Sequence, residues 1–357
     1  MNGRLLICLL ALAVSTRMAA FEYRLETFAD GLSLPWSIAF LPDGSALVTE
    51  LGGQLRRIDT SGQIGEAIEN VPAVYFAGQG GLFDVLPHPE FSRNGLVYLS
   101  YAEGSPKNNG TVIARGKLVE NRLENVEIIY RNAPRRATPV HYGGRMAFLA
   151  DGSMLLTTGD GFDYREAAQL VSSGLGKVIR MNDDGSPAQG NPFPESPYVY
   201  SYGHRNPQGL VVSRAGTIWL HEHGPRGGDE LNRIEAGVNY GWPAITYGLD
   251  YNGAIISPYT EWPGMAQPVH YWLPSIAPSG LTIYEGDLFP EWKGDLFVGA
   301  LVDREVRRLD LVNGEVVAEE ALFGELEARI RDVRVGPEGA LYILLPDKIV
   351  RVLSDTL

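Results

Sequence analysis

The sequence of 357 residues has almost no cysteine, since Cys8 is the only one. Cys8 lies in an apolar stretch near the N-terminus, residues 5–14, so a chain that loses its first twenty residues has no thiol. Disulfides are then excluded. The stability of the fold must come from core burial, strand pairing and any bound metal ions.

Long apolar runs are also missing. The stretch 5–14 has about ten residues, whereas a membrane-spanning helix needs about twenty. A short apolar stretch behind a basic residue is typical of a signal peptide. Small residues offer cleavage points at two places: Ala13 and Ser15, or Ala19 and Ala20. We expect residues 1–20 to be a signal peptide and the protein to be exported, periplasmic or secreted; an N-terminal membrane anchor is the alternative.

Positive charge is scarce, with 30 Lys and Arg against 43 Asp and Glu and a formal net charge of −13. Loss of residues 1–20 removes two positive charges, Arg4 and Arg17, and takes the formal charge from −13 to −15. Such a chain is a poor partner for nucleic acid. The 42 Gly, 23 Pro and 45% hydrophobic residues are typical of a turn-rich globular protein.

One hairpin pattern recurs along the chain, in which an apolar strand is followed by a turn with glycine and a second apolar strand. Four copies are clear and two are weaker: residues 38–50, 146–158, 210–221 and 333–345, then 94–100 and 293–300. The intervals are long enough for four-stranded sheets. We therefore predict an all-β fold, a six-bladed propeller that forms one domain over residues 21–357, with a β-sandwich as the alternative.

Propellers bind ligands on one face, in loops that the blades contribute in turn. The unusual loops of this sequence set polar or basic side chains among glycines. They are residues 78–82, 141–145, 202–209, 221–230, 239–243 and 329–332.

These loops resemble those of the soluble quinoprotein sugar dehydrogenases, a family that includes the aldose sugar dehydrogenases and soluble glucose dehydrogenase. The most specific match is Gly203-His-Arg-Asn-Pro-Gln-Gly209 followed by His223-Gly-Pro225. The resemblance extends from about Leu34 to Asp347. It implies pyrroloquinoline quinone (PQQ) and calcium as cofactors, a sugar substrate, an electron acceptor of unknown identity, and a monomer or homodimer.

PQQ carries three carboxylates and an ortho-quinone, so its site needs several cations in an otherwise acidic protein. Arg329 and Arg331 are two residues apart and would point the same way on a strand. The family uses such a pair for the cofactor carboxylates. The resemblance implies further cofactor contacts at Gln79, Arg205, Asn206 and Tyr251.

Calcium is a hard ion that accepts backbone carbonyls as readily as carboxylates. The resemblance implies that the carbonyls of Gly224 and Pro225 hold the ion that also touches the quinone. It implies a second, structural calcium ion near Glu230 and Tyr240. In the first site the ion would act as a Lewis acid.

His141 matches the family's general base, which removes the proton of the sugar hydroxyl while hydride leaves the same carbon. Arg205 would stabilise the charge that develops on the quinone oxygen. Two positions depart from the pattern. Val302 stands where relatives often have a lysine, and Arg304 is a candidate substitute for that lysine. Val140 stands where the glucose dehydrogenase branch has an aspartate. The valine therefore favours the aldose dehydrogenase branch.

Two other functions fit a six-bladed propeller. A calcium-dependent lactonase would use the ion and a histidine, but it has no need of Arg205, Arg329 and Arg331. A non-catalytic binding module would not need His141 and Gln79. The arginine set therefore favours the quinoprotein hypothesis.

Export with removal of the leader can be tested on the exported protein. Mass spectrometry should find a new N-terminus between residues 16 and 21, because both sets of small residues direct cleavage there. A cytoplasmic protein with Met1 intact would contradict the prediction.

Overall fold

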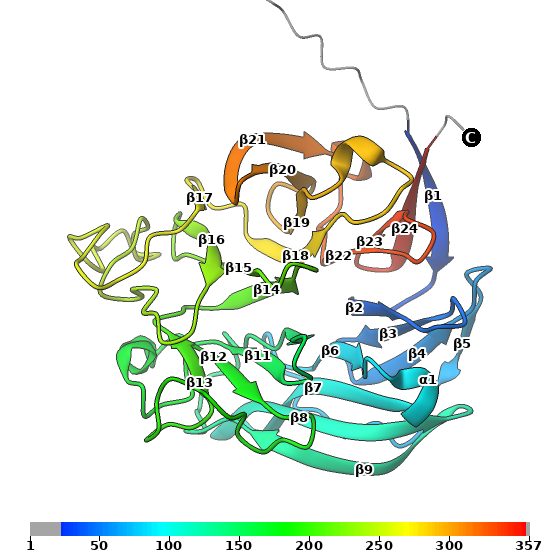
Figure 1. The fold of residues 1–357 in the computed structure, drawn as a ribbon, viewed down its shortest axis with the longest axis horizontal. Helices are drawn as coiled ribbons and strands as arrows, with labels where there is room; N and C mark the ends of the chain where they lie inside the picture. The colour runs from blue at the N-terminus through cyan, green and yellow to red at the C-terminus, as the bar shows by residue number, and fades with distance from the viewer. Residues whose placement is uncertain (1–22, 355–357) are drawn as a thin grey trace, which may run out of the picture.

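The computed structural model describes residues 23–354, and its strands form six four-stranded antiparallel sheets. Figure 1 shows these sheets following one another round a common centre in chain order, as the blades of a propeller. The prediction of a six-bladed β-propeller is confirmed. The leader expected at residues 1–20 lies outside the described residues. No helix within residues 23–354 is long and apolar enough to cross a membrane.

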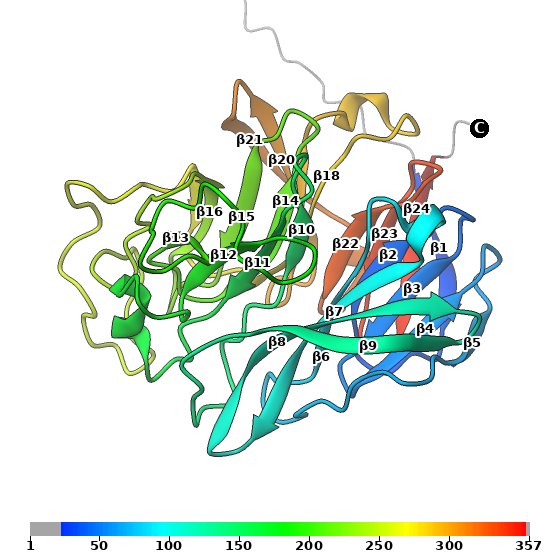
Figure 2. The same cartoon turned by 60° about the horizontal axis from the view of Figure 1, so that its bottom comes forward.

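Each blade runs from an innermost strand, which contacts the innermost strands of its neighbours, to an outermost strand at the rim. In that order the first three blades are β2 (Pro35–Phe40), β3 (Ala46–Glu50), β4 (Gln54–Ile58) and β5 (Ile64–Ala67); β6 (Leu82–Pro87), β7 (Leu96–Ser105), β8 (Asn108–Val119) and β9 (Arg122–Arg131); and β10 (Met146–Phe148), β11 (Met154–Thr158), β12 (Lys177–Met181) and β13 (Val199–Tyr202). The hairpin of β7 and β8 is the longest and projects beyond the body of the ring (Figure 2).

The fourth and fifth blades are β14 (Pro207–Val212), β15 (Ile218–Glu222), β16 (Asp229–Ile234) and β17 (His270–Trp272); and β18 (Pro278–Ile283), β19 (Leu296–Ala300), β20 (Val306–Val312) and β21 (Glu315–Leu322). The short helices are α1 (Phe91–Asn94), η1 (Arg165–Gln169), η2 (Pro290–Trp292) and η3 (Gly324–Leu326). The connection between β16 and β17, residues 235–269, contains no strand and extends outward from the ring on the left of Figure 1.

The sixth blade joins the two ends of the chain. It consists of β22 (Asp332–Val335), β23 (Leu341–Leu344), β24 (Lys348–Ser354) and, as its outermost strand, β1 (Tyr23–Asp30). β1 pairs with β24 from Tyr23 opposite Ser354 to Asp30 opposite Lys348. Backbone hydrogen bonds between the first and last strands therefore close the ring.

The recurring hairpins of the sequence lie at equivalent places in the blades. Each contains the second strand of its blade, and the four clear copies contain the hairpin of the first and second strands. In the first blade Gly44 takes a φ of +84°, and the Asp43 carboxylate accepts a hydrogen bond from the Ser45 N–H at 3.0 Å. A turn of this kind tolerates glycine best, because it needs the left-handed conformation.

Apolar side chains fill the space between neighbouring blades. Leu47 and Leu55 of the first blade pack with Leu82, Leu99 and Val112 of the second in one buried cluster. The alternation of inward and outward residues along each strand places these side chains on the sheet faces that meet.

Charged side chains close the centre of the ring. Arg145, just before β10, is 1% exposed and lies with Nη2 3.0 Å from Asp332 Oδ1 and Nη1 3.6 Å from Asp84 Oδ1. Its Nε donates to the carbonyl of Gln208 at 2.8 Å, and its guanidinium lies 4.0 Å from the ring centroid of Trp36. Burial lowers the pKa of Arg145, and the charge of Asp332 opposes that shift.

The same network reaches the remaining blades. Asp84 accepts a hydrogen bond from the Ser37 hydroxyl of β2. Arg334 lies with Nε 3.2 Å from Asp332 Oδ2 and donates from Nη1 to the carbonyl of Leu281 on β18 at 2.9 Å. The six innermost strands, or the residues directly before them, therefore all contribute a group to one buried network.

We predict that Arg145→Met destabilises the protein by about 3–5 kcal/mol. The reason is that removing one partner of a buried ion pair leaves Asp332 and Asp84 without compensation in a medium that solvates them poorly. The midpoint of urea unfolding measures this loss.

The matched control is Arg93→Met, since Arg93 pairs with Glu90 on the surface, where both side chains are exposed. An exposed pair contributes at most about 1 kcal/mol. Equal midpoints for the two variants would show that the central network does not stabilise the ring.

Candidate active site

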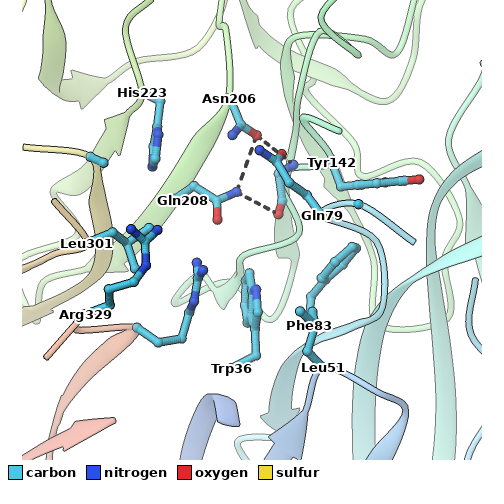
Figure 3. Close-up of a pocket in the computed structure, with 14 residues that line it drawn as sticks. Trp36, Leu51, Gln79, Phe83, Tyr142, Asn206, Gln208, His223, Leu301 and Arg329 are labelled. Atoms are coloured by element: carbon cyan, nitrogen blue, oxygen red, sulfur yellow. Dashed lines mark hydrogen bonds between the residues drawn. The ribbon is translucent and has the colours of Figure 1, made fainter. Parts of the chain in front are cut away.

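A cavity of about 330 Å³ lies on the face of the ring where the innermost strands begin. Residues from all six blades line it: Trp36, Leu51, Gly78, Gln79, Phe83, Tyr142, Gly143, Asn206, Gln208, His223, Ala277, Leu301, Arg329 and Arg331. Figure 3 shows how these side chains surround it. Gln79, Asn206, Arg329 and Arg331, which the sequence assigned to one site, thus meet in one cavity.

Two arginines form one side of the cavity. Arg329 and Arg331 stand in the loop before β22, within the loop that the sequence singled out, and both line the cavity. Within residues 23–354, neither guanidinium pairs with a carboxylate. Burial and the nearby charges of Arg145 and Arg329 lower the pKa of Arg331 to about 10. This wall carries unneutralised positive charge and suits an anion.

Aromatic rings and amides form the other side of the cavity (Figure 3). The ring of Phe83 lies 5.4 Å from that of Trp36 and 5.4 Å from that of Tyr142. Above these rings, the Gln208 amide donates to Asn206 Oδ1 at 3.4 Å. A planar ligand with several oxygens fits such a wall, because the rings pack on its face and the amides meet its edge.

His141 forms a buried pair with Asp160 next to this cavity. His141 Nδ1 lies 2.7 Å from Asp160 Oδ1, and the ring is almost completely buried. The Asp160 carboxylate also accepts hydrogen bonds from Trp242 Nε1 at 2.8 Å and from the Phe162 N–H at 2.7 Å. The contact to Asp160 places the proton of a neutral ring on Nδ1 and leaves Nε2 as the basic atom.

The surroundings keep His141 neutral. Burial lowers the pKa of His141 below its ordinary value; Asp160 opposes this shift, and the positive charges of Arg205 and Arg136 add to it. For Asp160, burial alone would raise the pKa, but the hydrogen bond and charge of His141 and the charge of Arg205 lower it. A neutral histidine with an ionised partner can accept a proton at neutral pH.

Several groups hold the backbone of His141 in an unusual conformation. Its φ is +53°, a value that residues other than glycine seldom adopt. Arg136 Nη2 donates to the carbonyls of Val140 at 3.2 Å and His141 at 3.0 Å, and Gln79 Oε1 accepts from the His141 N–H at 2.8 Å. A Cβ on Gly159 would lie 2.1 Å from the His141 carbonyl oxygen, so only glycine fits there.

Arg205 points away from the main cavity into a neighbouring one of about 280 Å³, which Asp160, Trp242 and Tyr251 also line. Its Nη1 donates to the carbonyl of Gly224 at 2.5 Å, and its Nη2 lies 3.4 Å from the Tyr251 hydroxyl. The chain therefore brings Arg205 and Tyr251 together, as predicted, but beside the cavity that Asn206 and the arginine pair line.

The two metal sites expected from the sequence can be located only by their residues. Within residues 23–354, no three His, Cys, Asp or Glu side chains converge in a way that could hold a metal ion. Pro225 lines the cavity of about 280 Å³, and both Gly224 and Pro225 line a further cleft; neither lines the main cavity. Because the Gly224 carbonyl accepts from Arg205, a cation bound to it would compete with that guanidinium.

Glu230 and Tyr240 adjoin a second polar cluster. Glu230 lies opposite Glu222 in the sheet, and burial together with the Glu222 charge raises the pKa of Glu230 to about 8. His204 Nδ1 lies 2.8 Å from Glu222 Oε1, and the His204 ring stacks on Tyr240 at 4.8 Å. Two neighbouring carboxylates with this mutual repulsion favour binding of a cation.

Two residues expected near the cofactor lie elsewhere. Val302 is exposed and lines a different cleft, and Arg304 is exposed and is not among the residues that line the main cavity. Arg304 therefore does not take the place of a lysine in that cavity. Leu301, the residue before Val302, lines the main cavity instead.

Sequence reasoning missed Asp160, Arg136 and Gln208. Asp160 stands between two glycines in Gly159-Asp-Gly161, directly after β11, and this was the one available signal for it. Gln208 lies within the motif of residues 203–209, but no role was assigned to it, and Arg136 has no motif around it; its partners are the backbone carbonyls of Val140 and His141.

Comparisons with known proteins agree with this geometry. A model of the family described as "Glucose / Sorbosone dehydrogenase" matches residues 32–353. The aldose sugar dehydrogenase YliI of Escherichia coli is 38% identical over 362 residues, which cover 98% of this chain and 97% of YliI.

Solved structures are similar over most of the chain. A crystal structure of a glucose dehydrogenase has a TM-score of 0.89 and 42% identity, covering 93% of this chain and 99% of that one. The PQQ-bound form of an aldose sugar dehydrogenase from Streptomyces coelicolor has a TM-score of 0.77 and 30% identity, covering 94% and 99%.

We predict that Asp160→Asn lowers the pKa of His141 still further, because the hydrogen bond and negative charge of Asp160 favour the protonated ring. NMR titration of the His141 ring measures the shift. Asp163→Asn is the matched control, since Asp163 is exposed in the same loop and should leave the pKa of His141 unchanged. An unchanged or higher pKa in Asp160→Asn would contradict the assigned pair.

Proposed function

The chain belongs to the glucose/sorbosone dehydrogenase family, and on that premise we propose that it oxidises aldose sugars at the anomeric carbon to lactones, with PQQ and calcium as cofactors. The observation that carries the proposal is that two arginines without carboxylate partners line a cavity next to a buried His–Asp pair: Tyr142, the residue after His141, lines that cavity, and Asp160 lines the neighbouring one. Neither a calcium-dependent lactonase nor a binding module needs both features.

The residues of the cavity fit PQQ. Arg329 and Arg331 supply positive charge for its carboxylates, and each charge-assisted hydrogen bond contributes about 1.5–3 kcal/mol. Gln79, Asn206 and Gln208 would supply amides for its remaining oxygens, and Trp36 would supply apolar surface. When bound there, PQQ supplies an electrophilic carbonyl that accepts hydride.

His141 acts as the general base in this proposal. Nε2 of the neutral ring takes the proton of the anomeric hydroxyl as that carbon loses hydride, so the C–O bond of the sugar becomes a carbonyl. Asp160 fixes the tautomer and stabilises the imidazolium that forms. Arg205, which lines the neighbouring cavity, would stabilise the negative charge that develops on the quinone oxygen.

Calcium belongs to the proposal on the basis of the donor groups. The carbonyls of Gly224 and Pro225 would hold one ion, and the Gly224 carbonyl already faces the positive charge of Arg205. Glu230 and Tyr240 would hold or border a second ion. The pKa of Glu230 is raised by burial and by the charge of Glu222, and a cation would offset the repulsion between these two carboxylates. We also propose export, which the leader at residues 1–20 supports.

The decisive experiment titrates cofactor-free protein with PQQ, with and without calcium, and then supplies a panel of aldoses with an artificial dye. We expect dye reduction only when PQQ and calcium are both present. Binding of PQQ is followed separately by its absorbance. Failure to bind PQQ at micromolar concentration, or binding without dye reduction by any aldose, would overturn the proposal.

Two variants separate binding from turnover. Arg331→Ala should weaken PQQ binding about ten- to hundredfold through the loss of a charged contact, and Val302→Ala is its control, because Val302 lies outside the cavity.

His141→Gln should bind PQQ normally but lose about 10²- to 10⁴-fold in kcat. Since burial keeps His141 neutral, the wild-type rate should not depend on this residue's ionisation above about pH 6.5. Normal turnover by His141→Gln would assign the base elsewhere.

A further inference from the structure

Lys177, at the start of β12, is a lysine without any exposed surface. Within residues 23–354, no carboxylate pairs with its ammonium. Burial lowers the pKa of Lys177 to about 7, so the interior disfavours the charge. A methionine would fill the same space without this cost, and lysines are seldom fully buried without an ionic partner. The lysine therefore points to a task that needs its N–H bonds.

Three backbone carbonyls surround the ammonium. Its Nζ donates to the carbonyls of Ala167 at 3.0 Å and Ala168 at 2.9 Å, both in η1, and to that of Leu175 at 2.5 Å. A lysine has three N–H bonds only when it is protonated, so these contacts use every donor of the charged form. The side chain of Lys177 therefore ties η1 to the segment directly before β12.

Gln169, the last residue of η1, holds a neighbouring loop. Its Nε2 donates to the carbonyl of Trp242 at 2.8 Å and to Asn239 Oδ1 at 3.0 Å. Its Oε1 accepts from Asn239 Nδ2 at 2.8 Å. Because Gln169 directly follows the two η1 carbonyls that Lys177 binds, the ammonium determines where this amide meets the loop.

Trp242 connects that loop to the His–Asp pair. Its indole Nε1 donates to Asp160 Oδ2 at 2.8 Å, while Asp160 Oδ1 lies 2.7 Å from His141 Nδ1. One oxygen of the carboxylate is thus held by the indole and the other by the histidine. A displaced indole would let the carboxylate rotate, and the His141 ring would lose the partner that fixes its tautomer.

We propose that Lys177 is a positioning residue for the pair of His141 and Asp160. Its ammonium fixes the carbonyls of η1, and this fixes where Gln169 binds Trp242. The indole then holds Asp160 against His141. Neither Lys177 nor Gln169 lines the main cavity or the neighbouring one, so both act through other residues. The inference rests on the proposed function in that His141 is the base there, but the geometry of the pair can be measured without cofactor or sugar.

Proton NMR of the cofactor-free protein tests this geometry. A short, charge-assisted hydrogen bond shifts its proton far downfield, and the signal from His141 Nδ1 is assigned by its loss in His141→Gln. We expect Lys177→Met and Gln169→Leu each to move this resonance upfield, because the bond to Asp160 lengthens. Lys293→Met, at an exposed lysine, is the matched control and should leave it unchanged.

An unchanged resonance in Lys177→Met or in Gln169→Leu overturns the inference. Gln169 is only partly buried, so Gln169→Leu still decides the question if Lys177→Met does not fold.

Replacing the lost ammonium separates its hydrogen bonds from its packing. Lys177→Ala removes the outer carbons and the ammonium of the side chain, and n-propylammonium supplies just those atoms. We expect propylammonium to restore the downfield resonance of Lys177→Ala. Tetramethylammonium at equal concentration has no N–H bond and should not restore it. Restoration by both ions, or by neither, would show that the three hydrogen bonds are not what positions the pair.

Kinetics of the loaded enzyme give the last measurement. Lys177→Met should lower kcat about tenfold and leave the affinity for PQQ unchanged, because Lys177 does not line the cavity. In the His141→Gln background the same substitution should change kcat by about twofold or less, since no base is left to position. An equal loss in both backgrounds would indicate a general structural effect and overturn the inference. If the loaded enzyme oxidises no sugar while the NMR results hold, the proposed function fails and the positioning role stands.

Discussion

The buried pairing of Arg145 with Asp332 and Asp84 is the constraint on which the rest of the structure depends. Propeller blades repeat around an axis, and the centre is the one place where all of them can be tied together. A buried ion pair is stable only if hydrogen bonds satisfy its remaining atoms, and here backbone carbonyls and a serine do so. The same guanidinium lies on Trp36 and binds the carbonyl of Gln208, which both line the cavity. The Arg145 guanidinium therefore both joins the blades at the centre of the ring and supports residues that line the cavity.

Positive charge has two effects in the candidate site. Arg329 and Arg331 make the cavity attractive to a polyanion, while Arg205 and Arg136 lower the pKa of His141. Burial is the main cause of the lowered pKa of His141, and the hydrogen bond and charge of Asp160 oppose it; the pKa of Asp160 is itself lowered, so Asp160 stays ionised. An acidic protein thus concentrates its cations where they suit an anion, and there they add to the effect of burial on the base.

The sequence predicted most of the fold and part of the site, for different reasons. Hairpins are local, so residues 38–50 and 146–158 show their turns and alternating strands without any tertiary information. Gln79, His141 and the arginine pair could be assigned because they stand in glycine-rich loops with a family resemblance. Asp160 could not, since its role depends on the loop after β11 meeting the loop before β10. Arg329 and Arg331 stay in the loop before β22, because strand pairing begins only at Asp332.

The pairing of β1 with β24 determines when the protein can finish folding. Tyr23 and Ser354 are neighbours in the closed ring, although almost the whole chain separates them in sequence. During synthesis, or during passage through a membrane with the N-terminus leading, β1 emerges first and has no partner until the last strand arrives. The ring therefore stays open until the last strand has emerged, and its final seam forms only after that. The two ends also lie together, so the gene could be cut at another blade boundary and rejoined here without changing the order of the blades in space.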